Sequence, residues 1–193
     1  MWVPARIGRA VVILLFVAAC GSASSSSTSV ATTRVVEEQG VSFRLTSSSF
    51  RDGDAIPVRY TCDGENVSPP LSWDMVPEGS GALVLVMDDP DAPRGTFTHW
   101  VLYDIPPGTR ELPEAIPPRD ALDDGARHGR NDFGKLGYGG PCPPPGAPHH
   151  YRFTLYAVDA PLGLAPGVTK QEVTNALDGH TIGSARLVGT YGR

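Results

Sequence analysis

Apolar and polar residues alternate along several short stretches of this chain. Val41 to Thr46 and Tyr151 to Val158 have the two-residue period of strands with one buried face. Ala82 to Met87 is continuously apolar and bounded by turn residues, which predicts a central strand covered on both faces. Trp100 to Ile105 predicts a comparable strand, and Ile182 to Tyr191 predicts the last strand of the chain.

Two further segments are extended but less regular. Ile56 to Thr61 is a strand candidate, although Pro57 favours an edge position or the first residues of a strand. Ser68 to Trp73 is predicted to be extended, because a proline disfavours the helical conformation in the residue before it. Residues 109–138 predict a long surface excursion with one short helical turn near Asp120 to Asp123.

One helix is predicted to begin after Thr169. Thr169 and Glu172 match a capping box, in which each side chain bonds the backbone of the other residue. Gly179 can adopt the left-handed conformation that ends a helix, and the apolar residues between them lie on one side: Val173, Ala176 and Leu177. Many short strands and a single helix predict a mainly β protein, an antiparallel β-sandwich with a few short peripheral helices.

The composition fits one globular domain together with a targeting segment. The chain has 193 residues, of which 40% are hydrophobic and 19% charged. Its 22 glycines and 19 prolines fit many turns between short strands. The formal net charge of -5 argues against a nucleic-acid binder, which needs a basic face to displace counterions from phosphates.

The N-terminus has the features of a bacterial export signal. Arg6 and Arg9 precede an apolar segment, residues 10–19, that is too short to span a bilayer. The small residues before Cys20 and the glycine after it resemble the lipobox of bacterial lipoproteins. This resemblance implies a signal peptide over residues 1–19, a diacylglycerol on Cys20, and an exported domain anchored to the cell membrane of the bacterial envelope. An ordinary secretory signal with an incidental Cys20 is the alternative.

The rest of the chain divides into a linker and a domain. Residues 20–40 are rich in Ser and Thr without periodic apolar positions, and they predict a flexible linker. The folded domain is expected over residues 41–193. Its two cysteines, Cys62 and Cys142, are an even pair in an exported protein and therefore a disulfide candidate. Two buried free thiols are the alternative.

Three carboxylates and a histidine form the first candidate cluster. Asp88, Asp89 and Asp91 directly follow the central strand, and Pro90 holds their turn rigid because it fixes its own φ angle. A carboxylate that bonds one imidazole nitrogen of His99 would fix its tautomer and aim the other N–H into a cavity. The alternatives are aspartates that cap their own turn and a core histidine.

A second cluster lies about fifty residues further along the chain. Residues 139–146 have no bulky side chains, so their glycines can expose backbone N–H groups to a ligand. A rigid loop without a ligand is the alternative. Along a strand His149 and Tyr151 share one face, while His150 takes the other. An imidazole and a phenol on a common face suit the oxygens of phosphate or sulfate.

An ordered set of motifs spans both clusters: Asp89-Pro90-Asp91-Ala92-Pro93, His99-Trp100, Gly139-Gly140-Pro141 and His149-x-Tyr151. This set resembles the phosphatidylethanolamine-binding protein family, and in particular its exported bacterial branch, also called Raf-kinase-inhibitor-like. The resemblance runs from about residue 42 to the last residue. It implies a β-sandwich with a small cavity that accepts phosphate-like anions and phospholipid headgroups. The pocket residues that it implies are Asp89, Asp91, Pro93, His99, Gly140, His149 and Tyr151.

Two departures from the family pattern limit what the resemblance implies. The family commonly has Arg between the His and the Tyr, where this chain has His150, so the charge beside the pocket is weaker near neutral pH. The sequence also ends after its last predicted strand, without the C-terminal helix that borders the cavity in eukaryotic members. Regulation of kinases is therefore not expected to transfer to this chain.

The leading hypothesis is a non-enzymatic, membrane-anchored binding module without a cofactor. Its expected partners are a small anionic ligand or phospholipid headgroup and the membrane that holds its anchor. A hydrolase using His and Asp as acid and base is an alternative, although the sequence has no Gly-x-Ser-x-Gly nucleophile motif. A metal site from His99, His149 and the aspartates is another. Inhibition of a protein partner is a further hypothesis, and nothing in the sequence names that partner.

Overall fold

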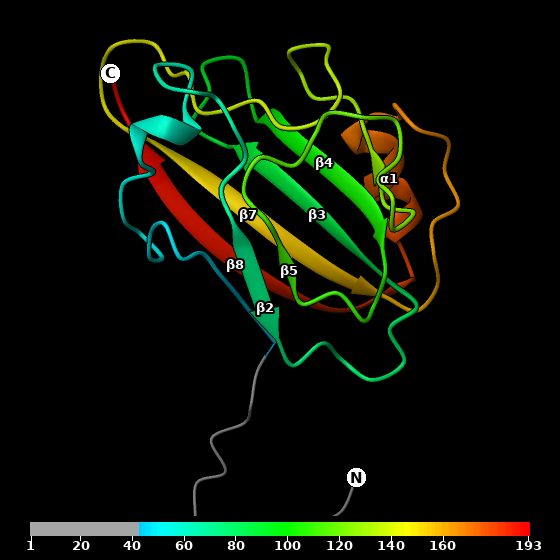
Figure 1. Cartoon of the computed structure of the whole chain (residues 1–193). Coiled ribbons are helices and arrows are strands. Elements are labelled where there is room, and N and C mark those ends of the chain that lie inside the picture. The colour runs from blue at the N-terminus through cyan, green and yellow to red at the C-terminus, as the bar shows by residue number, and fades with distance from the viewer. Residues whose placement is uncertain (1–42) are drawn as a thin grey trace, which may run out of the picture. The chain divides into compact units, whose positions relative to one another are not determined.

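The computed structural model describes residues 43–193 as two antiparallel sheets and one α-helix (Figure 1). The larger sheet has the strand order β6-β4-β3-β7-β8. Its strands are β3 (Ala82–Asp89), β4 (Phe97–Ile105), β6 (Arg127–His128), β7 (His149–Val158) and β8 (Thr181–Tyr191). The smaller sheet, in the order β1-β2-β5, consists of β1 (Arg44–Thr46), β2 (Leu71–Asp74) and β5 (Glu111–Leu112). The prediction of a mainly β sandwich is confirmed.

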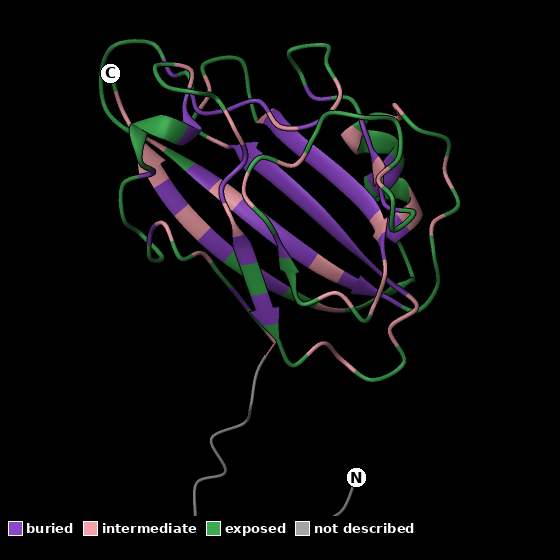
Figure 2. Cartoon of the chain, viewed as in Figure 1, coloured by how far each residue is buried: buried purple, intermediate pink, exposed green. Residues whose placement is uncertain are grey.

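Strand β3 is the central strand of the larger sheet. Its side chains are apolar from Ala82 to Met87, so both of its faces can be buried. All eight of its residues are buried (Figure 2). Leu83, Leu85 and Met87 belong to one core cluster, whereas Val84 and Val86 belong to a second one. The alternation of strand side chains therefore places two cores on the two faces of β3.

The smaller sheet and the helix cover these two faces. Leu45 and Trp73 of the smaller sheet join the first core cluster. Val173 and Leu177 of α1 (Lys170–Leu177) join the second. The predicted capping box at Thr169 is present in both directions, and Gly179 has a φ of 77°, as a left-handed helix end requires.

Two secondary-structure predictions are wrong. Ile56 to Thr61 is not a strand but contains a 3₁₀-helix, η1 (Val58–Tyr60), because Pro57 begins a tight turn in which the Tyr60 amide donates to the Pro57 carbonyl. No helical turn forms near Asp120 to Asp123. The Leu122 amide instead donates to the Ala126 carbonyl at 2.7 Å and the Gly125 amide to the Leu122 carbonyl at 3.0 Å, so the chain reverses here in a tight turn.

Cys62 and Cys142 form a disulfide across 80 residues of sequence, which confirms the predicted pairing. The bond ties the segment after η1 to the glycine- and proline-rich stretch before β7. Within residues 43–193, no helix is long and apolar enough to cross a membrane. The predicted signal peptide, Cys20 and the linker lie outside the described residues.

Candidate functional site

The candidate site lies at one end of the larger sheet, where β3 ends and both β4 and β7 begin. Strand β3 runs antiparallel to both β4 and β7. The last residue of β3, Asp89, is therefore paired with Phe97 at the start of β4 and lies near His149 at the start of β7. Antiparallel pairing thus brings residues 89, 97–99 and 149 to one end of the sheet.

A cavity of about 170 Å³ opens at this end. Sites for drug-sized ligands are roughly 300–1,000 Å³, so this cavity holds only a small chemical group. Its wall combines one acid, two imidazoles, two phenylalanines and three prolines: Asp89, Ala92, Pro93, Phe97, His99, Phe133, Cys142, Pro143, Pro144 and His149. Polar groups are therefore few and converge on one space within an apolar wall.

Asp89 and His149 are in direct contact in the buried part of the site. The Nδ1 atom of His149 lies 2.7 Å from the Oδ2 atom of Asp89, and the side chains are 12% and 5% exposed. The backbone amide of Asp91 donates to the other oxygen, Oδ1, at 2.8 Å. Because a carboxylate accepts, the proton of a neutral His149 ring lies on Nδ1, and Nε2 is the nitrogen left for a ligand.

His99 is held by a backbone carbonyl and not by a carboxylate, contrary to the prediction. Its Nδ1 atom lies 2.7 Å from the carbonyl oxygen of Gly139, which can only accept. The proton of the neutral ring is therefore on Nδ1, and Nε2 is an acceptor where an N–H was expected. Burial lowers the pKa of His99, so the ring is neutral at pH 7.

A β-bulge aims His99 at the cavity. Thr98 pairs with Asp88 and Trp100 pairs with Met87, which leaves His99 as the extra residue of β4. Bulges of this kind re-aim a side chain beside a functional site. Trp100 can thereby stay in the core while His99, its neighbour, reaches the cavity wall.

Tyr151 lies against the imidazole of His99 and does not line the cavity. The two rings meet edge-on with their centroids 5.1 Å apart. The Tyr151 hydroxyl is buried without a hydrogen-bond partner among residues 43–193. Burial raises the pKa of Tyr151, and the negative charge of Asp89 raises it further. The hydroxyl therefore stays protonated and remains a potential donor.

Asp91 is a predicted pocket residue that the structure places outside the cavity. Its Oδ2 atom accepts from both the backbone amide and the Nδ1 of His150, at 2.8 Å each. The Asp91 and His150 side chains are 42% and 59% exposed, and these bonds lower the pKa of Asp91. The opposite directions of His149 and His150 confirm the predicted alternation along this strand. Asp91 thus positions the turn around Asp89 from outside.

Gly140 also lies outside the cavity, and its amide is already occupied. The Gly140 amide donates to the Asn66 side chain at 2.7 Å, and the Gly139 amide donates to the His99 carbonyl at 2.9 Å. The expectation that these glycines offer N–H groups to a ligand is therefore not met. A Cβ atom on Gly140 would lie 2.4 Å from the carbonyl oxygen of Tyr60, so close packing explains the glycine.

Two phenylalanines complete the wall and were not predicted. The rings of Phe97 and Phe133 have centroids 4.8 Å apart, and Phe133 also meets His99 edge-on at 5.4 Å. Asp132 holds Phe133 in place because its carboxylate accepts from the Thr98 amide. For Phe133 the available signal was a single phenylalanine inside the polar excursion 109–138.

These residues lie inside a recognised family match. The family model described as phosphatidylethanolamine-binding protein matches residues 46–192. The chain belongs to the phosphatidylethanolamine-binding protein family. The match includes every residue of the cavity wall.

Three relatives show how far the similarity extends. A UPF0098 protein of Methanothermobacter thermautotrophicus is 52% identical over 149 residues, which cover 77% of this chain and 98% of that protein. A Mycobacterium tuberculosis protein named "Putative lipoprotein LppC" is 43% identical over 148 residues, covering 76% and 71%. The crystal structure of E. coli YbcL, described as a new member of the mammalian family, matches with a TM-score of 0.74, 34% identity and coverage of 78% and 98%.

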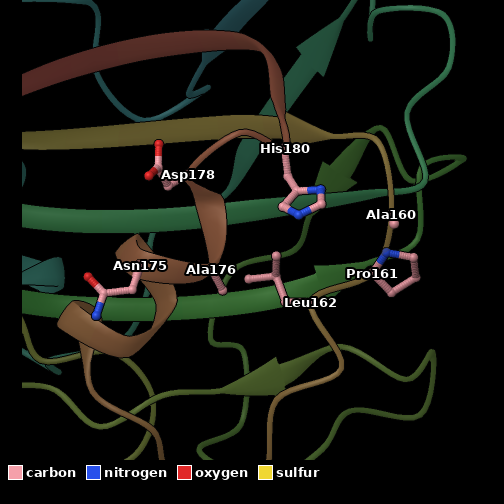
Figure 3. A pocket seen from close by; sticks show the side chains of 7 residues that line it. All are labelled: Ala160, Pro161, Leu162, Asn175, Ala176, Asp178 and His180. Atoms are coloured by element: carbon pink, nitrogen blue, oxygen red, sulfur yellow. The ribbon is translucent and has the colours of Figure 1, made fainter.

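A second hollow of this family member lies beside α1 but gathers no comparable set of groups (Figure 3). His180 bonds Asp159 at 2.9 Å, and both side chains are about half exposed. The polar ends of Asn175 and Asp178 point away from the His180 ring in Figure 3.

Among residues 43–193 no group of three or more acidic, His or Cys residues is placed to hold a metal ion. The wall of the first cavity contains no Ser or Thr, and its Cys142 is disulfide-bonded.

Proposed function

We propose that this protein is a non-enzymatic binding module that captures a small anionic group, of the phosphate or phospholipid-headgroup kind. The convergence of Asp89, His99 and His149 on one cavity of about 170 Å³ carries the proposal. A headgroup fits such a volume, whereas the acyl chains of a lipid do not. The phenylalanines and prolines of the wall exclude water and strengthen the few polar contacts.

The hydrogen-bond pattern implies that the anion binds together with a proton. Both imidazoles use Nδ1–H inside the protein, so a neutral ring offers the ligand only the acceptor Nε2. A fully ionised anion is a poor partner for two acceptors and the Asp89 carboxylate. An imidazole that carries a second proton has donors on both nitrogens, so the Nε2 atom of a protonated His149 could donate to the anion.

We further propose that the domain is exported and held at the membrane by a diacylglycerol on Cys20. The name of the mycobacterial relative supports an anchored member of this branch. An anchor would keep the cavity close to phospholipid headgroups. A protein partner that the domain inhibits or regulates is a secondary part of this proposal.

Sulfate is a suitable test ligand because its own charge does not change between pH 6 and pH 8. Calorimetric titration of the full-length chain is expected to show millimolar or tighter binding at pH 6. The affinity should fall about tenfold per pH unit where one proton is taken up. His149→Ala should weaken binding at least about tenfold, whereas His180→Ala, which alters an exposed histidine outside the cavity, should leave it unchanged.

Phosphate and phosphoethanolamine then separate two ligand sources. Tighter binding of phosphoethanolamine favours a lipid headgroup, and equal binding favours a free anion. Absence of sulfate and phosphate binding at tens of millimolar, or equal binding by the His149→Ala variant, would overturn the proposal.

A further inference from the structure

Strand β8 lies at the edge of the larger sheet, and among residues 43–193 only one segment bonds to part of that edge (Figure 1). Residues 52–56 run along its C-terminal part and begin in a turn, where Gly53 has a φ of 83°. The amides of Gly53 and Ile56 donate to the carbonyls of Val188 and Thr190, at 2.8 Å each. This edge therefore already accepts one added segment.

The bonds at Val188 and Thr190 show which backbone groups of β8 point away from β7. Val188 and Thr190 direct their N–H and C=O groups away from β7. The register between β7 and β8 continues without a shift through Arg186 and Ser184, so these residues face the same open edge. Both are exposed, and within residues 43–193 their backbones have no partner outside the sheet. Four backbone groups are thus available to another strand.

A hollow of about 360 Å³ lies against this open edge. Strand β1 and residues 50–52 border it opposite the edge of β8. Leu45, Phe50 and Leu187 are buried in its wall, at 2%, 6% and 2% exposed. The hollow therefore offers an apolar floor beside unpaired backbone, which is the combination that binds an extended peptide.

The same hollow is lined by three arginines, Arg44, Arg51 and Arg186. None of them makes an ion pair with any residue in 43–193, although Asp74 lies across from Arg44 in the strand register. The one acid in the wall, Asp52, accepts the Val188 amide. Positive charge on an edge strand prevents pairing with another copy, and it favours a strand that carries carboxylates.

We propose that the edge at Ser184–Arg186 and the adjoining hollow bind an extended, acidic peptide segment of a partner protein. The segment adds to β8 as a further strand and continues the line of residues 52–56. The open edge at Ser184–Arg186 is about 10 Å long, since a strand rises about 3.3 Å per residue. The backbone bonds supply affinity, and the three arginines select carboxylate side chains. This site is separate from the anion cavity.

The test uses a blocked seven-residue peptide of alternating valine and glutamate, titrated into the full-length chain. We expect backbone amide exchange of Ser184 and Arg186 to slow by at least about tenfold at saturation, as expected for newly bonded amides. The signals of His99 and His149 should not move. A peptide with lysine in place of glutamate should bind at least about tenfold more weakly.

Two variants separate backbone pairing from charge. Ser184→Pro removes an outward N–H without breaking a bond to β7, and it should abolish binding, while Ser184→Thr should retain it. Arg186→Glu should weaken the glutamate peptide and improve the lysine peptide. This charge-reversed variant keeps the test decisive if the proline variant does not fold.

Three results with the peptides would overturn the proposal, and a fourth comes from a comparison with vesicles. The three are no protection of the two amides by either peptide, equal binding of both peptides, or protection that depends only on protein concentration, which indicates self-association. Phosphatidylglycerol vesicles serve as the comparison for a membrane surface. Protection by the vesicles and not by the glutamate peptide would assign the edge to lipid and also contradict the proposal.

Discussion

Two neighbouring carboxylates at the end of β3 have different environments. Asp88 faces the helix side of the sheet, where Arg152 Nε donates at 2.8 Å and Lys170 Nζ at 2.9 Å. Asp89 faces the cavity, where it is paired with the imidazole of His149. Two cationic side chains compensate Asp88, whereas Asp89 is paired with a single imidazole. The comparison shows that strand alternation divides one acidic motif into a structural residue and a ligand-site residue.

Removal of the disulfide should cause the largest loss of stability. The disulfide lies at the cavity whose wall includes Asp89. Replacing Cys62 and Cys142 with serine frees a loop of 80 residues. The chain-entropy model gives a loss of about 4–5 kcal/mol in the free energy of unfolding. Urea unfolding measures this loss. Sulfate affinity should fall with it because Cys142 is part of the cavity wall. A loss below about 1 kcal/mol would show that the bond does not stabilise this end.

Asp88→Asn should reduce stability without changing ligand binding. The variant leaves Arg152 and Lys170 without their shared carboxylate, and their side chains are 34% and 30% exposed. Because water screens them partly, we expect a loss of about 2 kcal/mol. Asp178→Asn is the matched control, since Asp178 is exposed and makes no ion pair within residues 43–193. A fall in sulfate affinity would contradict the division between the two aspartates.

Asp89→Asn should instead change ligand binding, and in particular its dependence on pH. An asparagine amide can donate to His149 Nδ1, which moves the proton of the neutral ring to Nε2. The site then offers a donor without taking up a proton. Sulfate affinity should change less than about threefold between pH 6 and pH 8, against tenfold or more in the unaltered protein. An unchanged pH dependence would show that His149 is not the proton acceptor.

The smallest expected effect concerns the pH dependence of stability. Burial lowers the pKa of His99 below its ordinary value of 6.5. The unfolded chain therefore takes up this proton first as the pH falls below 6.5, and the folded state loses stability there. His99→Gln should reduce the difference in unfolding free energy between pH 8 and pH 5. Burial lowers the pKa of His128 too, so part of the difference should remain. An identical difference in both proteins would contradict this assignment.

Local pattern predicted most of the strands but failed where a local turn competed with it. The apolar run of β3 is short and bounded by turn residues, which favours a buried strand, and the alternation of β7 fixed which of its side chains share a face. Ile56 to Thr61 has strand-forming residues, yet Pro57 favours the 3₁₀ turn that forms instead. Asp120 to Asp123 pairs with the extended residues that follow it, and its charge pattern gave no indication of this pairing.

The sequence by itself determined that Asp89 and His149 lie at the ends of strands, and that His149 and His150 point in opposite directions. These features depend on the two-residue period of a strand, which is a local property of the backbone. Tertiary structure alone decided the bulge at His99, the bond from Gly139 that sets its tautomer, and the position of Phe133 in the wall. Register and loop path depend on contacts between residues far apart in the chain, so no local pattern encodes them.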